Sequence, residues 1–208
     1  MMTVYEFRGF PNPARVRIAL AEKGLIEQVT FVTVDVPGGE HRQPAFLAKN
    51  PGAAVPVLAL ADGTHIAECT AITEYLDHLD GNPSLTGKDP KERAIIAMMQ
   101  RRAAIGLLET ATAHFHHATP GLGPHLETYQ NREWGEKNRE RALAGMVYLD
   151  SALERQPYLA GERFTVADIT AFAGMVLADF AKLAMPEELA RLRAWRARVA
   201  GRPSIAHA

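Results

Sequence analysis

Glu68-Cys69-Thr70 combines an acid, a lone cysteine and a small hydroxyl residue where an expected strand turns into an apolar-periodic helix. Unpaired N–H groups and the positive end of the helix dipole make such a point favourable for an anion. A glutamate beside it can pair with an ammonium group. We therefore expect Glu68 and Cys69 to hold a zwitterion, such as the end of an α-amino acid. The alternative is that Cys69 and Thr70 only cap the helix and Glu68 is a solvated acid.

Val55-Pro56 lies between a glycine-containing turn and an expected strand. Proline lacks a backbone donor, so it belongs at the start or the edge of a strand, and its peptide bond can be cis. A cis bond here would leave the Val55 backbone unpaired and pointing outward. Such an edge can bind an extended peptide by strand addition. The alternative is a simple proline at a strand start.

The first part of the chain alternates segments with strand and helix patterns. An Asp-Gly pair between two apolar runs predicts a hairpin, and Pro and Gly bound the other segments. The expected elements are a strand over 3–7, a helix over 13–24, a strand over 29–36, a short helix over 44–49, a hairpin around 61–63 and a helix over 70–79.

The residue pattern changes between residues 80 and 90, and no strand-like run follows. Apolar periodicity predicts long helices over about 90–117, 131–156, 166–182 and 187–200, and "ATPGLGPH" is expected to be a loop. Thr165 and Asp168 form a capping-box pattern before the third of these helices. The fold class is therefore α/β plus all-α, with a mixed-sheet domain over 1–82 followed by a helical bundle over 88–208.

Composition limits the partners. The chain has 208 residues, 47% of them hydrophobic, with 23 Lys plus Arg against 24 Asp plus Glu. This balance gives no electrostatic footprint for nucleic acid or an anionic membrane, and no apolar run approaches a bilayer-spanning length. The single cysteine excludes an internal disulfide, and the first residues lack the apolar core of a signal peptide. We expect a cytoplasmic protein whose partners are small molecules or protein.

Four segments, in their order and spacing, resemble a cytosolic glutathione transferase of the bacterial type over nearly the whole chain. They are "NPARVRIALAEKG", "HRQPAFLAKNPGAAVPVL", "DGTHIAECTAITEYLD" and "YLAGERFTVADITAF". The family's thioredoxin-like domain followed by an all-α domain matches the expected order. The resemblance implies a homodimer that uses glutathione as a co-substrate and needs no metal. It also implies an interface formed by the 90–117 helix and the edge of the 68–79 helix.

The resemblance assigns roles to the first two motifs. Glutathione is expected to lie extended along the cis-proline edge, with the Val55 main chain as partner of its cysteinyl part. Its γ-glutamyl end is expected at Glu68 and Cys69, where relatives usually carry serine at the second position. Cysteine is a weaker hydrogen-bonding group than serine, but a backbone contact at that position would remain.

The glycyl end of glutathione is expected to have different partners in this sequence. Ala54 stands where relatives often carry a polar or basic residue. His41 and Lys49 are the candidates to replace it, since "EHRQPAF" resembles a segment in which relatives place a glutathione-binding basic residue. For both, the alternative is a solvated loop side chain.

Catalysis requires a donor that lowers the pKa of the glutathione thiol, because a thiol with a pKa of about 8.5 is only about 3% thiolate at neutral pH. The loop "GFPNP" is where the family places it. Phe10 occupies the usual serine position and has no donor, whereas Asn12 occupies the position of cysteine in many bacterial members and carries an amide N–H. We therefore expect Asn12 to be the catalytic residue. The alternative is a turn residue between prolines, and Tyr5 is expected in the core.

The helical domain is expected to supply an apolar pocket for an electrophile, lined by Met98, Met99 and Arg102 together with Phe10. Methionine adapts to irregular ligands, although a methionine at helical spacing is more often part of the core. The function implied is transfer of an alkyl or aryl group to the glutathione sulfur. The alternatives are a glutathione-dependent isomerase and a non-catalytic binding or interaction protein with the same fold.

His114, His116 and His117 look like a metal-binding cluster. Their spacing does not place all three on one helical face, and no neighbouring acid or cysteine completes a ligand set. No metal site is therefore expected there.

Overall fold

The computed structural model of the chain describes residues 2–208, and their contacts group them into two units. The first unit contains the residues up to Leu85 together with Pro203–Ala208, and the second contains Thr86–Arg202. The C-terminal segment joins the first unit because the short helix η4 (Pro203–His207) packs on α1 (Pro11–Glu22).

The first unit is built on a four-stranded mixed sheet with the order β2-β1-β3-β4. Strand β1 pairs in parallel with β2 and antiparallel with β3, and β3 pairs antiparallel with β4. The mixed sheet and the hairpin predicted from the Asp-Gly turn are confirmed. The strands are β1 (Met2–Glu6), β2 (Val29–Thr33), β3 (Val57–Ala59) and β4 (His65–Ala67).

Strand β2 is shorter than the expected strand over 29–36. Val34 N–H still donates to the Glu6 carbonyl at 2.7 Å, but Val36 N–H turns back to the Val34 carbonyl at 2.8 Å. The chain therefore leaves the ladder after Val34, although its alternating pattern continues. Two short helices, η2 (Glu40–Arg42) and α2 (Pro44–Leu47), follow.

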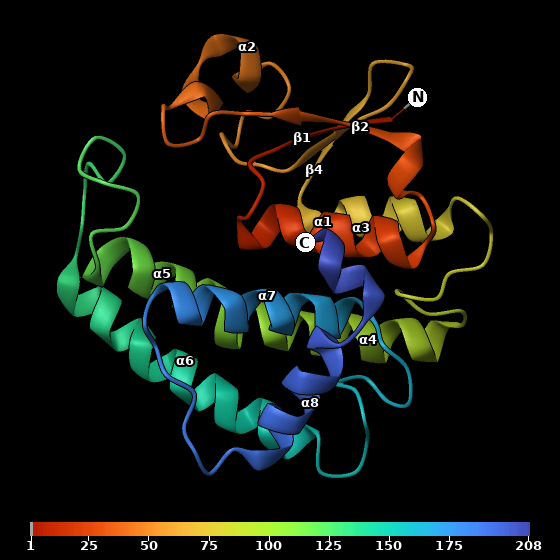
Figure 1. Cartoon of the computed structure of the whole chain (residues 1–208), viewed down its shortest axis with the longest axis vertical. Helices are drawn as coiled ribbons and strands as arrows, with labels where there is room; N and C mark the ends of the chain where they lie inside the picture. The colour runs from red at the N-terminus through yellow and green to blue at the C-terminus, as the bar shows by residue number, and fades with distance from the viewer. Residues whose placement is uncertain (1) are drawn as a thin grey trace. The chain divides into compact units, whose positions relative to one another are not determined.

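Helices α1 and α3 (Cys69–His78) pack against each other on one side of the sheet (Figure 1). Their apolar faces and the two central strands share one core because helical spacing places these side chains on the inner faces. The buried members of this core are Val4, Val16, Leu20, Leu58, Cys69, Ile72 and Leu76. The core thus fixes where α1 and α3 begin relative to each other.

The second unit is built of helices, as predicted. Helix α7 is its most buried element: nearly all of its residues are shielded from solvent, and it packs against α4 and α5, while α6 packs along α5. The helices are α4 (Pro90–Ala103), η3 (Ala104–Leu108), α5 (Glu109–Ala118), α6 (Arg132–Ala152), α7 (Val166–Phe180) and α8 (Ala190–Ala200). Over residues 2–208, no helix combines the length and the apolar character needed to span a bilayer.

The expected helix over 90–117 is divided by η3, a short π-helical turn. The Thr110 hydroxyl donates to the carbonyls of both Gly106 and Leu107, at 3.0 Å each, which satisfies carbonyls at this irregular turn. At the same place the Gly106 carbonyl faces Gly145 of α6. Apolar periodicity does not distinguish a single π turn inside a long helix from continuous α-helix.

Asp168 organises the start of α7. Its carboxylate accepts the Leu159 N–H at 2.9 Å and the Thr165 N–H at 3.0 Å. It also accepts the Trp195 indole N–H of α8 at 2.8 Å. The predicted capping box is confirmed. Burial raises the pKa of the Asp168 carboxyl, and these donors act in the opposite direction.

We predict that Gly145→Ala destabilises the protein, because a Cβ atom added there would lie 2.0 Å from the Gly106 carbonyl oxygen. The free energy of unfolding in urea should fall by about 2–3 kcal/mol. Gly106→Ala is the matched control, since its Cβ would meet the nearest atom of Gly145 at an ordinary 3.8 Å. It should change the free energy of unfolding by less than about 1 kcal/mol. Equal effects of the two substitutions would contradict this account of the close contact between the Gly106 carbonyl and Gly145.

Candidate functional site

The N-termini of α1 and α3 meet in the first unit. Cys69 is the first residue of α3, and its thiol donates to the main-chain carbonyl of Asn12, in the first turn of α1, with a sulfur–oxygen distance of 3.4 Å. The positive ends of two helix dipoles therefore lie close together. We call the group formed by Asn12, Arg15, Glu68 and Cys69 the helix corner.

Prolines restrict the backbone donors at the start of α1. Pro11 and Pro13 have no N–H, and the Ala14 N–H donates to the Phe10 carbonyl at 3.0 Å. The N–H of Asn12 is thus the donor that the sequence leaves to the first turn. Phe10 precedes the helix with an extended backbone, and its ring packs on that of a neighbouring phenylalanine, Phe7.

The side chain of Asn12 is exposed, and its Oδ1 atom accepts a hydrogen bond from Nη1 of Arg15 at 3.1 Å. A guanidinium group only donates, so the amide group of Asn12 presents its oxygen to Arg15 and its Nδ2 donors elsewhere. Arg15 was not among the candidates found from the sequence. The three-residue spacing, which places both side chains on one helical face, is the signal that predicts their contact.

Cys69 stays a thiol at neutral pH. Its residue is only 6% exposed, and burial raises the pKa of its thiol, with the Glu68 charge acting in the same direction. The positive charge of Arg15 acts in the opposite direction but does not outweigh burial. Cys69 is therefore a structural link between two helices rather than a nucleophile.

Glu68 precedes α3 with an unusual backbone conformation. Its φ is +68° and its ψ is 117°, a region of backbone conformation that residues other than glycine rarely adopt. Glu68 is also exposed to solvent. Backbone strain of this kind persists where the surrounding structure holds a residue in place, and it clusters at binding sites. Glu68 is held in this conformation at the residue that directly precedes the first turn of α3.

The peptide bond between Val55 and Pro56 is cis. Val55 lies before β3 and outside the strand ladder, whose end pair joins Tyr5 to Val57. The turn before it is held by the buried side chain of Asn50, which donates to the Ala54 carbonyl at 2.8 Å. The bond is therefore the cis isomer, which the sequence allowed but did not require.

The candidates for the glycyl end lie after β2. His41 is buried in η2, and its Nδ1 atom has no hydrogen-bond partner among residues 2–208. Burial and, second, the neighbouring Arg42 charge lower the pKa of His41, so its ring is neutral at neutral pH. The Lys49 amine donates to the Ala45 carbonyl at 3.1 Å and lies 5.3 Å from the centre of the Tyr5 ring.

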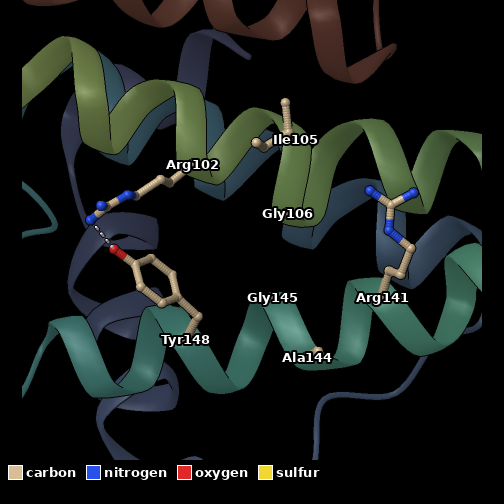
Figure 2. A pocket seen from close by; sticks show the side chains of 7 residues that line it. All are labelled: Arg102, Ile105, Gly106, Arg141, Ala144, Gly145 and Tyr148. Carbon is tan, nitrogen blue, oxygen red and sulfur yellow. Dashed lines mark hydrogen bonds between the residues drawn. The ribbon is translucent and has the colours of Figure 1, made fainter.

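The helical candidates line two different hollows of the second unit. Arg102 lines a cavity of about 470 Å³ between α4, η3 and α6, where it donates to the Tyr148 hydroxyl at 2.6 Å (Figure 2). Met98 and Met99 line a separate cavity of about 350 Å³ with Leu159. Met98 is 43% exposed and Met99 is buried. Their role as a pocket for an electrophile stays a prediction.

The three histidines of α5 face three different partners. His114 Nδ1 lies 3.3 Å from the Gly135 carbonyl, and His116 Nδ1 lies 2.6 Å from the Glu127 carboxylate. His117 Nδ1 accepts the Asn131 N–H at 3.1 Å. Within the part of the chain that the structure describes, no group of His, Cys, Asp and Glu residues is arranged to hold a metal ion.

Two family models match the chain. Residues 11–79 match the glutathione S-transferase N-terminal domain, and residues 110–203 match the glutathione S-transferase C-terminal domain. The two matches fall on the mixed-sheet unit and the helical unit in the order that the sequence predicted.

Individual relatives agree with the family models. The chain is 55% identical to glutathione S-transferase 2 of Saccharomyces cerevisiae, over 98% of this chain and 88% of the relative. A solved glutathione S-transferase domain-containing protein of Marinobacter aquaeolei VT8 is 62% identical, with a TM-score of 0.96 over 98% of this chain and 99% of that one. The chain is also 31% identical to a maleylacetoacetate isomerase of Pseudomonas aeruginosa, over 81% of this chain and 77% of the relative.

We predict that Glu68→Gly yields a more stable protein than Glu68→Ala. Both substitutions remove the carboxylate, but only glycine relieves the backbone strain at φ +68°. The free energy of unfolding in urea should differ by about 1 kcal/mol in favour of glycine. As a control, glycine and alanine at Glu74, inside α3, should rank in the opposite order. Alanine at position 68 matching or exceeding glycine would show that the backbone there is unstrained.

Proposed function

The chain belongs to the glutathione S-transferase family, and from this premise we propose that its first unit binds glutathione at the helix corner and activates its thiol. The observation that carries the proposal is the convergence of the N-termini of α1 and α3 through the hydrogen bond of Cys69 to Asn12. Two helix dipoles and the Arg15 charge favour a negatively charged ligand at this point.

We place the γ-glutamyl end of glutathione at Glu68 and Cys69. Its carboxylate would accept N–H groups from the first turn of α3, and its ammonium group would pair with the exposed Glu68 carboxylate. The cysteinyl part would pair with the main chain of Val55, which lies outside the strand ladder beside the cis bond. His41 and Lys49 remain the candidates for the glycyl carboxylate.

Asn12 is the proposed activating residue. Its backbone N–H and its Nδ2 atom are donors at the positive end of α1, where a thiolate would be stabilised. Lowering the pKa of the glutathione thiol by about two units requires about 2.7 kcal/mol of preferential stabilisation of the thiolate. Hydrogen bonds to a charged acceptor contribute about 1.5–3 kcal/mol each, so one or two well-aimed donors suffice.

The reaction follows from the thiolate. Its sulfur attacks an electrophilic carbon, a carbon–sulfur bond forms, and in a substitution the leaving group departs with its bonding electron pair. The thiol proton is released to solvent when the thiolate forms. We propose that the electrophile is apolar and that the helical unit supplies its binding surface, either at the hollow lined by Met98 and Met99 or at the hollow lined by Arg102. Phe10, which lies in the first unit just before α1, is the candidate on the side of the helix corner. We also propose that the protein is cytoplasmic.

A glutathione-dependent isomerase is the second candidate, supported by the 31% identity to a maleylacetoacetate isomerase. In that reaction the thiolate would add to a conjugated double bond and leave again after rotation, so glutathione would not be consumed. The higher identity to a transferase favours the first candidate. Consumption of glutathione during turnover distinguishes the two, and absence of turnover with retained glutathione binding would indicate the non-catalytic binding protein.

We predict that Asn12→Ala lowers kcat/KM for glutathione conjugation of 1-chloro-2,4-dinitrobenzene by about 10- to 100-fold, because the side-chain donor to the thiolate is lost. The Kd for S-hexylglutathione, which has no thiol, should stay within about threefold of the original value. Asn82→Ala, an exposed asparagine of the same unit, is the control and should leave both quantities unchanged. An unchanged kcat/KM in Asn12→Ala would make Asn12 a turn residue only.

We also propose that the protein is a homodimer whose interface includes the α4–α6 face of the second unit. Large apolar side chains are exposed on α4, η3 and α6, and apolar surface that lies together marks interaction sites. The exposed side chains assigned to the interface are Ile95, Ile105, Val147 and Tyr148, whereas Met98 is kept as a candidate for the electrophile surface.

Ile105→Glu is therefore expected to convert the dimer into a monomer, because it buries a charge in the proposed interface. Light scattering after size-exclusion chromatography measures the change. Phe180→Glu is the control, since Phe180 is 61% exposed at the end of α7 and should leave the mass of the dimer unchanged. A dimer that tolerates Ile105→Glu would place the interface elsewhere.

A further inference from the structure

We propose that Arg15 is a positioning residue for thiol activation: it fixes which end of the Asn12 side-chain amide faces the glutathione sulfur. The inference rests on the proposed function, because it assigns a role to Arg15 only if glutathione binds at the helix corner. Arg15 itself does not touch the sulfur in this account.

The two ends of the Asn12 side-chain amide have opposite effects on a nearby sulfur. Its Nδ2 end donates, and its Oδ1 end only accepts. An N–H aimed at a thiolate stabilises it, whereas a carbonyl oxygen aimed at the same sulfur repels it. The direction of the amide therefore decides whether Asn12 lowers or raises the pKa of a bound thiol.

Arg15 fixes the direction in which the Asn12 amide points. Its Nη1 atom lies 3.1 Å from Oδ1 of Asn12, and a guanidinium can only donate, so the oxygen must face Arg15. The Nδ2 donors then turn away from Arg15. Without this contact, the exposed amide of Asn12 would be free to rotate between both orientations, and only part of the population would be competent.

Arg15 and Cys69 hold Asn12 from two sides. Arg15 is only 7% exposed, and it contacts the side chain of Asn12 from one turn further along α1. Cys69 donates to the main-chain carbonyl of Asn12 from α3. Side chain and main chain are thus both fixed before a ligand arrives, which is the pre-organisation that electrostatic catalysis requires.

A direct effect of the Arg15 charge is the rival explanation. Within the helix corner, that charge acts to lower the pKa of the Cys69 thiol, so it could act on a bound thiol as well. Two substitutions of similar length separate the explanations. Arg15→Gln removes the charge but keeps an N–H donor for Oδ1 of Asn12, whereas Arg15→Met removes both.

The experiment titrates the ultraviolet absorbance of the thiolate of bound glutathione against pH in the wild-type protein and its variants. Arg15→Met is expected to raise the pKa of the bound thiol, so that the thiolate fraction near neutral pH falls about tenfold. Arg15→Gln should retain most of the wild-type fraction. Arg17→Lys is the matched control, since Arg17 lies on the same helix but pairs with Glu6, and it should change nothing.

Combination with Asn12→Ala tests whether Arg15 acts through Asn12. In that background Arg15→Met should have no further effect on the pKa of the bound thiol, because the group that it positions is absent. An undiminished effect in that background, or equal effects of Arg15→Gln and Arg15→Met, would overturn the positioning role. Either result would leave the proposed function intact.

Asn12→Asp covers the case in which an Arg15 variant does not fold. It leaves Arg15 and its oxygen partner in place but presents a second oxygen where the N–H stood, so the pKa of the bound thiol should rise above that in Asn12→Ala. A pKa like that of the wild type would overturn the orientation argued here. A wild-type protein that binds glutathione without lowering its thiol pKa would overturn the proposed function and this inference together.

Discussion

The hydrogen bond from the Cys69 thiol to the Asn12 carbonyl is the constraint on which the candidate site depends. It joins the first turns of α1 and α3, which the shared apolar core already holds against the sheet. Because burial keeps Cys69 protonated, the thiol remains a donor and the link is maintained at neutral pH. The orientation of Asn12 by Arg15 and the place of Glu68 at the start of α3 both follow from where these two helices begin.

The two units divide structural and chemical tasks in different ways. In the helical unit, the most buried carboxylate, Asp168, is saturated with donors from Leu159, Thr165 and Trp195, and it stabilises the start of α7. In the first unit, two polar residues of the helix corner, Asn12 and Glu68, are exposed, and the backbone of Glu68 is strained. Backbone strain of this kind clusters at sites where a ligand binds.

Much of the fold could be predicted from the sequence because the patterns are local. The Asp-Gly hairpin, the helix starts at prolines and the capping box at Thr165 and Asp168 each specify their element within a few residues. The early end of β2 and the π turn at Ala104–Leu108 could not be predicted, because they depend on contacts made elsewhere in the chain. The alternating pattern continues past the end of β2, and the helical pattern continues through the π turn, so apolar periodicity reveals neither feature.

The candidate site was less accessible to sequence reasoning. The sequence allowed both isomers of the Val55–Pro56 bond, and the link between Cys69 and Asn12 spans 57 residues of chain. Adjacent methionines and Arg102 predicted one pocket, whereas the structure separates them into two hollows.

The most direct test of thiol activation is calorimetric titration with glutathione in buffers of different ionisation enthalpy. The account predicts proton release near neutral pH with glutathione but none with S-hexylglutathione, and glutathione binding without proton release would contradict it.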